Sequence, residues 1–159
     1  MITYYKDNKI KLEFSQEPQT ITREVCNPLL TDEQREEYLK KPYLLRSSVI
    51  LKVTYKKQVS YIYIPENYVW NGANVPKFAW MIVGSKDEPE FRIASMVHDW
   101  LCEHHEDSRN DRYLSSLIFT SLLAVAGVEK YRQVLMFHSV DNFQKVFGKD
   151  LKGNKWKNF

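Results

Sequence analysis

The sequence has few cysteines and no long apolar run, and each shortage excludes a class of protein. Cys26 and Cys102 are the two cysteines among 159 residues, which is too few for a disulfide framework. No stretch is long enough to span a bilayer as a helix. The start, M-I-T-Y-Y-K-D-N, lacks the basic and apolar regions of a signal peptide. We therefore expect a soluble protein, made in a reducing cytoplasm, with no transmembrane segment.

Charge of one sign is also scarce. The 23 basic side chains nearly balance the 20 acidic ones, so the composition predicts no extended or sequence-specific nucleic-acid surface. The basic excess is concentrated in residues 149–159, where lysines accompany Trp156 and Phe159. We predict one domain over residues 1–148 and a solvated basic tail over 149–159, with docking of the tail on a partner, membrane or nucleic acid as the alternative.

Runs rich in Val, Ile, Leu and Tyr predict an N-terminal antiparallel sheet. One hairpin is expected around Asp7-Asn8 and another around Lys56-Lys57-Gln58. Between them, Thr31 to Gln34 has the pattern of a capping box and predicts a charged surface helix that ends near Lys40. The predicted strands cover residues 2–5, 10–14, 20–25, 44–55 and 59–64.

Three helices are expected after residue 88, over residues 89–105, 108–127 and 129–147. In the first, apolar residues and two histidines recur at the helical period, which predicts an inward stripe. The members of this stripe are Phe91, Ala94, His98, Leu101 and His105. The predicted fold class is therefore α+β, an N-terminal antiparallel sheet followed by a three-helix part.

The His-Asp pair inside this helix carries the most chemistry. In M-V-H-D-W-L-C-E-H-H-E-D, His98 can accept a proton while Asp99 acts as a ligand or orienting group. Upstream, the loop V-W-N-G-A-N-V-P at residues 69–76 has Gly72 and two asparagines, which suit a tight turn with carbonyls directed to one point. We expect this loop and the helix to face each other.

Taken in order, these motifs resemble an uncharacterised family common in phages and prophages. Its pattern runs T-D-G-A-S-[IV]-P, then W, H-D-x-L-Y, R-x-x-x-D-x-x-F and G-V. The resemblance covers about half of the chain, through residues 69–76, His98-Asp99-Trp100-Leu101 and Gly127-Val128. That pattern is similar in turn to the D-G-C-S, H-D-F-G-Y and D-x-x-F signature of small secreted bacterial and fungal phospholipases A2. The resemblance implies a phospholipase-A2-like antiparallel helix pair.

The resemblance also assigns roles to single residues. His98 matches the catalytic base and Asp99 matches the calcium ligand on the helix. Asn71 stands where the family has the loop carboxylate, and Ser116 stands where it has the acid that orients the histidine. The family's tyrosine after H-D-x-L is Cys102. A site with fewer carboxylates binds Ca²⁺ more weakly, and disturbing the orienting acid of a comparable triad costs about 10⁴ in turnover.

These departures favour a scaffold whose catalysis is reduced or lost. We expect a phage-encoded virion component or host-interaction protein, in the host cytoplasm or the virion, whose partners are other phage or host proteins. Its cofactor would be none or weakly bound Ca²⁺, and Trp70, Asn71, Gly72 and Trp100 are the predicted binding residues. The alternative is an active calcium-dependent lipid acyl hydrolase that acts on phospholipid with His98 as its base.

Simpler interpretations stay open at the same residues. His98 can be a core histidine bonded to a backbone carbonyl. A zinc site would need His98, Cys102 and His138, without the usual paired ligand motifs. Asp111 can replace the missing orienting acid in another register, although its spacing from Ser108 also suits a helix cap. The acidic residues around His104 and His105 form a predicted solvated helix end.

Overall fold

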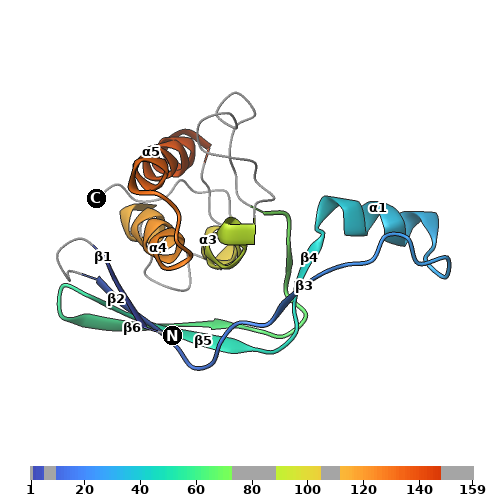
Figure 1. Cartoon of the computed structure of the whole chain (residues 1–159), viewed down its shortest axis with the longest axis horizontal. Helices are drawn as coiled ribbons and strands as arrows, with labels where there is room; N and C mark the ends of the chain where they lie inside the picture. Colours follow the sequence, from blue (N-terminus) through green and yellow to red (C-terminus); the bar gives the residue numbers. More distant parts are fainter. Residues whose placement is uncertain (1, 6–9, 73–88, 105–111, 148–159) are drawn as a thin grey trace.

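The computed structural model describes residues 2–5, 10–72, 89–104 and 112–147 of the chain. Several expectations fall outside these residues, namely the basic tail at 149–159, the cap at Ser108 and the roles of His105 and Asp111. In the described part the fold class is α+β, as predicted, with antiparallel sheets at the N-terminal side and a group of helices after them (Figure 1).

The described strands form two antiparallel sheets, whereas the sequence predicted one. The larger has the order β1-β2-β5-β6 and the smaller the order β3-β4-β7. The larger sheet consists of β1 (Ile2–Tyr5), β2 (Ile10–Phe14), β5 (Val49–Tyr55) and β6 (Gln58–Ile64). The smaller consists of β3 (Thr20–Thr22), β4 (Tyr43–Leu45) and β7 (Val69–Trp70).

The predicted strand at 44–55 is wrong as a single element. It is divided between β4 and β5, which belong to different sheets. The division falls at Ser47-Ser48, small polar residues that favour turns over a continuous strand. The predicted hairpin that follows is confirmed, with Lys56 and Lys57 in its turn and Tyr55 paired with Gln58. The division lets β4 pair with β3 and β7 while β5 joins the larger sheet.

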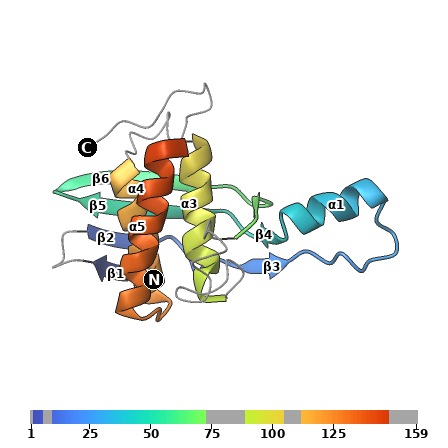
Figure 2. The same ribbon diagram turned by 90° about the horizontal axis from the view of Figure 1, so that it is seen from above.

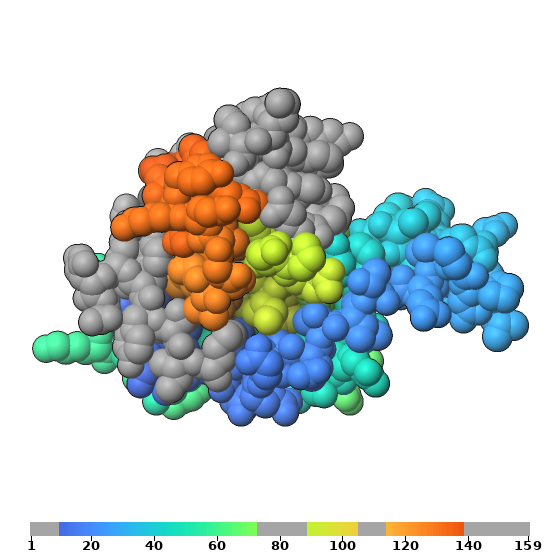
Figure 3. All heavy atoms as spheres, in the orientation of Figure 1, coloured from blue at the N-terminus to red at the C-terminus, as the bar shows by residue number. Residues whose placement is uncertain are grey.

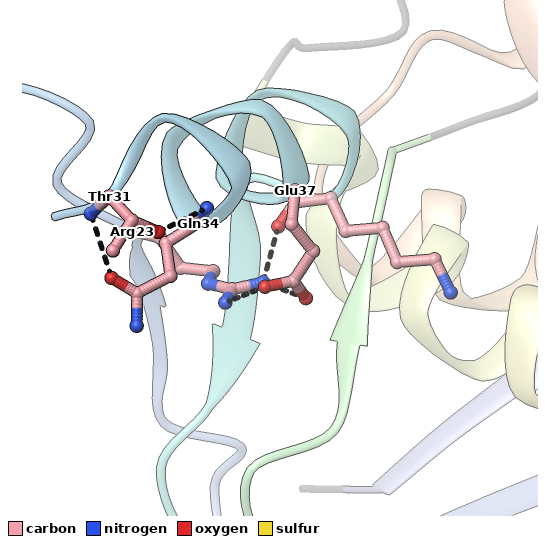
Figure 4. A network of polar contacts seen from close by, with 5 residues as sticks. Arg23, Thr31, Gln34 and Glu37 are labelled. Atoms are coloured by element: carbon pink, nitrogen blue, oxygen red, sulfur yellow. Dashed lines mark hydrogen bonds and ion pairs between the residues drawn. The ribbon is translucent and has the colours of Figure 1, made fainter.

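The segment between β3 and β4, residues 23–42, forms an arm that projects from one end of the molecule (Figures 1 and 2). It carries the helix α1 (Asp32–Lys40), and we call it the α1 arm. The predicted capping box is present, because the Gln34 amide donates to Thr31 Oγ1 at 3.1 Å and the Thr31 amide donates to Gln34 Oε1 at 2.9 Å (Figure 4). None of its residues is buried, so α1 is the surface helix that its charge predicted.

The helices after the loop are η2 (Pro89–Phe91), α3 (Arg92–His104), α4 (Arg112–Val125) and α5 (Lys130–Phe147). The helices α3, α4 and α5 lie on one face of the larger sheet, with α4 in contact with both α3 and α5 (Figures 1 and 3). Gly127, at φ 87°, reverses the chain after α4, where the Val128 amide donates to the Leu123 carbonyl at 3.1 Å. No described helix is long and apolar enough to cross a membrane.

Every second residue of β2 and β5 is buried, and these side chains form the sheet side of the core. Leu12 and Leu51 point inward while Lys11 and Ile50 point outward, as the two-residue period of a strand requires. The helices contribute the opposite wall, including Phe91, Leu101 and Phe119. Each fully buried side chain of this size contributes about 1.5–3 kcal/mol. The core therefore fixes the helix group against the sheet and sets the position of α3.

Candidate functional site

His98 lies in the interior between α3 and α4, with 3% of its surface exposed. Its ring centroid is 5.1 Å from that of Phe119 on α4, and Cys102 Sγ is 3.8 Å from each ring nitrogen. Asp99 Oδ1 is 4.0 Å from His98 Nδ1. Ser116, the position of the orienting acid, is fully buried on α4 one turn before Phe119. His98 therefore faces α4 because it lies on the buried face of α3 that the helical period predicted.

A pocket of about 190 Å³ opens beside this histidine and brings the predicted loop and helix together. Asn71 from the loop and Asp99 from α3 both line it, so these two sequence-predicted residues do meet. Gly72 follows Asn71 with φ 95°, a left-handed conformation that glycine adopts without strain. The residues lining the pocket are Lys41, Trp70, Asn71, Asp99, Cys102 and Glu103.

A cluster of three aromatic side chains, Tyr68, Trp70 and Trp100, joins the strand before the loop to α3 beside the pocket. Tyr68 stacks on Trp70 at 6.0 Å between ring centroids and meets the edge of Trp100 at 5.1 Å. Trp70 Nε1 donates to Ser95 Oγ at 3.1 Å, which ties β7 to α3. Trp100, one of the predicted binding residues, stacks on His104 at 3.7 Å and does not line the pocket. Trp70 and Trp100 therefore serve first to position the loop on the helix.

Two carboxylates and a buried phenol lie at or beside the pocket, which Lys41 also lines. Burial raises the pKa of Tyr68 well above its usual range, and the negative charges of Glu103 and Asp99 raise this pKa further. The Tyr68 hydroxyl is shielded from solvent and makes no hydrogen bond of good geometry to the described residues.

Sequence reasoning missed three residues of the pocket as functional groups. Glu103 follows Asp99 by one helical turn, so the i, i+4 spacing was the signal that both carboxylates share a face. Cys102 was noted as a departure from the family pattern and as a zinc ligand, not as part of a pocket wall. Lys41 comes from the end of the α1 arm, and no local pattern connects it to α3.

The donor set suits a hard cation better than zinc. Asp99, Glu103 and Asn71 offer carboxylate and amide oxygens, the ligand type that Ca²⁺ takes. Glu103 supplies a second carboxylate that the sequence comparison with phospholipases did not assign. The zinc alternative has no support, because no three His, Cys, Asp or Glu side chains within the described residues are grouped to hold a metal ion.

Comparison with known proteins places this site within a family. The chain is 28% identical over 85 residues to "Uncharacterized protein y4iH" of Sinorhizobium fredii (strain NBRC 101917 / NGR234), a match that covers 54% of this chain and 34% of that protein. The chain thus spans about a third of the length of that relative. No solved structure matches this chain.

The family match covers the helix and loop that carry the pocket. It runs over residues 48–140, which include Trp70, Asn71, Asp99 and Glu103 but leave out Lys41. The match extends over more than half of the 159 residues. The chain therefore belongs to the family described as "Protein of unknown function (DUF1353)".

Proposed function

We propose that this chain is a non-enzymatic binding protein that keeps a phospholipase-like loop and helix but no longer uses the histidine for catalysis. The observation that carries this proposal is the burial of His98, which lines no part of the pocket. A general base must come within about 2.6–3.2 Å of the proton it removes, or reach it through one water. Asp99, Cys102 and Glu103 of α3 line the pocket instead, so this helix presents two carboxylates and a thiol to a ligand, in a lining that also includes Lys41.

The biological setting of the proposal comes from the motif resemblance. A phage-encoded virion component or host-interaction protein would use the pocket and the projecting α1 arm as contact surfaces for other phage or host proteins. Leu39 on α1 and Leu29 just before this helix are exposed, which supports a contact surface at the arm.

Partner capture tests the binding role. The immobilised wild-type chain is compared with Glu103→Lys, which reverses a charge at the pocket, and with Glu17→Lys, the same change at an exposed residue outside it. We expect the wild type and Glu17→Lys to retain the same host or phage protein and Glu103→Lys to lose it. Equal capture by all three chains, with Glu103→Lys folded by circular dichroism, would contradict a pocket-dependent role.

A calcium-dependent acyl hydrolase is the second candidate function. Asp99 and Asn71 share one pocket, as the resemblance to phospholipases requires, and Glu103 adds a second carboxylate there. The three residues would hold Ca²⁺, which in such a site supplies polarisation of an ester carbonyl. Lys41 lines the same pocket, and its ammonium competes with a cation. We therefore expect a calcium Kd no tighter than about 10⁻⁴–10⁻³ M.

A micellar phospholipid assay separates the two candidates. Wild type and His98→Gln are measured with calcium and with chelator, beside a secreted phospholipase A2 as positive control. The binding proposal predicts no calcium-dependent hydrolysis by either chain. Calcium-dependent turnover by the wild type that His98→Gln abolishes would establish the hydrolase.

A calorimetric calcium titration tests the proposed ligands separately. Asn71→Asp should bind calcium more tightly than wild type, because Asn71 is exposed and the change adds a carboxylate.

A further inference from the structure

The strand β6 forms an edge of the larger sheet with an unusual composition. Among the described strands it pairs with β5 on one side, and no strand lies on its other side (Figure 2). Its sequence, Q-V-S-Y-I-Y-I, has no charged residue and no proline over the whole element. Natural edge strands are usually protected by lysine, proline, a bulge or short length. This edge has none of these devices between Gln58 and Ile64.

The hydrogen bonds of β5 fix which backbone groups of β6 point outward. The Ile50 carbonyl accepts from the Ser15 amide at 2.9 Å, and the Ile50 amide donates to Ser15 Oγ at 3.0 Å. Both groups of Ile50 are thus directed away from its partner Tyr63, so this is a non-hydrogen-bonded pair. The alternation of an antiparallel ladder then directs the N–H and C=O groups of Val59, Tyr61 and Tyr63 to the free edge.

The side chains of the same three residues form an exposed apolar row. Val59, Tyr61 and Tyr63 alternate with the buried Ile62 and Ile64, so they point to the face of the sheet opposite the core, and Tyr61 at the centre is 66% exposed. The residues between them, Ser60 and Ile62, point toward the core side. No described strand pairs with these outward backbone groups, and an edge of this kind beside exposed aromatics is suited to the addition of another strand.

We propose that β6 pairs with β6 of a second copy of this chain, antiparallel and centred on Tyr61. In this register Tyr61 faces its symmetry mate, Val59 faces Tyr63 of the other copy, and all outward backbone groups of the strand find partners. The ends are also complementary, because exposed Lys56 of one copy then lies by exposed Glu66 of the other. A two-fold contact of this kind is self-complementary and closes at the dimer, so it does not extend into fibres.

The dimer is expected to be weak. One strand pair with its flanking side chains falls below the roughly 1,200 Å² of a standard interface. We expect a Kd on the order of 10⁻⁵ M. This inference is independent of the pocket and of whether the chain has hydrolase activity.

Sedimentation velocity of the full chain from about 5 μM to about 500 μM tests the proposal. The wild type should pass from monomer to dimer. Tyr61→Glu should stay monomeric, because two carboxylates meet at the two-fold axis, while within each copy the new acid faces Lys52 across the β5–β6 ladder. Tyr131→Glu is the matched control, since Tyr131 is 59% exposed on α5 and the change is the same. It should dimerise like the wild type.

A charge exchange tests the register. Lys56→Glu and Glu66→Lys should each weaken the dimer by about threefold, and the double variant should restore it. A wild type that stays monomeric throughout, one that forms larger assemblies, equal effects of Tyr61→Glu and Tyr131→Glu, or a double variant no better than the singles would overturn the proposal.

Discussion

The Tyr68 hydroxyl is buried beside the pocket without a hydrogen bond of good geometry to the described residues. Its ring contacts Trp70 and Trp100, and these contacts do not need the oxygen. A buried polar group without a partner costs about 1–3 kcal/mol, so its removal should not destabilise the fold. We expect Tyr68→Phe to leave the free energy of unfolding unchanged or to raise it by up to about 1 kcal/mol, measured by urea denaturation. A loss of more than about 1 kcal/mol would contradict a hydroxyl that makes no stabilising hydrogen bond.

Lys56 and Lys57 adopt left-handed conformations in the β5–β6 turn, with φ values of 50° and 65°. A side chain at such a position costs about 1–2 kcal/mol, and a two-residue hairpin turn of this kind favours Asn-Gly. Because glycine also gains entropy in the unfolded chain, we expect Lys57→Gly to raise the unfolding free energy by about 0.5–1 kcal/mol. Asn67→Gly is the control, since Asn67 has φ 66° but asparagine tolerates this region. Equal gains from both changes in urea denaturation would refute strain at Lys57.

At the scale of single elements, α3 shows how far local periodicity extends. The spacing of Phe91, Ala94, His98 and Leu101 predicted a buried stripe, and all four are buried. Periodicity records which face of a helix is covered, but it does not record what covers it. The role of Lys41 at the pocket depends on an arm that returns from a distant part of the chain, which no local signal encodes.

The strands show the same limit. The two hairpins, at β1–β2 and β5–β6, were predicted because turn residues and flanking β-prone runs are neighbours in sequence. The β4–β7 pair was not predicted, because β7 consists of Val69 and Trp70 and gains its strand character from pairing with Leu44 and Tyr43. Short strands made by distant pairing leave almost no local pattern.

A charged contact between α1 and Arg23, the residue after β3, depends on pH. Arg23 donates to both Glu37 carboxylate oxygens, at 3.1 and 2.9 Å, and to the Lys41 carbonyl at 3.2 Å (Figure 4). The hydrogen bonds from Arg23 hold the pKa of Glu37 below its ordinary value of 4.5. A carboxyl with a lowered folded-state pKa stabilises the fold above its unfolded pKa, and this contribution is lost as pH falls through the folded pKa.

We therefore expect Arg23→Gln to raise the pKa of the Glu37 carboxyl toward 4.5, measured by NMR titration of its side chain. In the wild type, the protection factors of the α1 amides, which are exchange rates corrected for the intrinsic pH dependence, should fall as the pH drops below about 4.5. Arg35→Gln is the matched control, because Arg35 contacts Asp32 on the same helix and not Glu37. A Glu37 titration that is the same in the wild type and Arg23→Gln would contradict the assigned contact.

At the scale of the whole molecule, one core joins the larger sheet to the helices that carry the site. It includes inward residues of β2 and β5 together with residues of α3, α4 and α5. The outward face of the same sheet carries Ile50, Tyr61 and Tyr63, which the core does not use. The two faces of one sheet therefore differ, since one packs on the helices that carry the pocket and the other leaves Ile50, Tyr61 and Tyr63 exposed beside the β6 edge.

Neighbouring residues of β5 test this division directly. Leu51 is fully buried on the core face, and Ile50, beside it, is 42% exposed on the other face. Leu51→Ala should lower the free energy of unfolding by about 2–5 kcal/mol, because it removes apolar contacts and leaves a cavity. Ile50→Ala should cost at most about 1 kcal/mol.

Both changes in the free energy of unfolding are measured by urea unfolding at protein concentrations below the dimerisation range, followed by far-UV circular dichroism and by tryptophan fluorescence. Coincident transitions by both probes mean that the protein unfolds in one cooperative step. Separate transitions in Leu51→Ala would contradict a single core shared by the sheet and the helices.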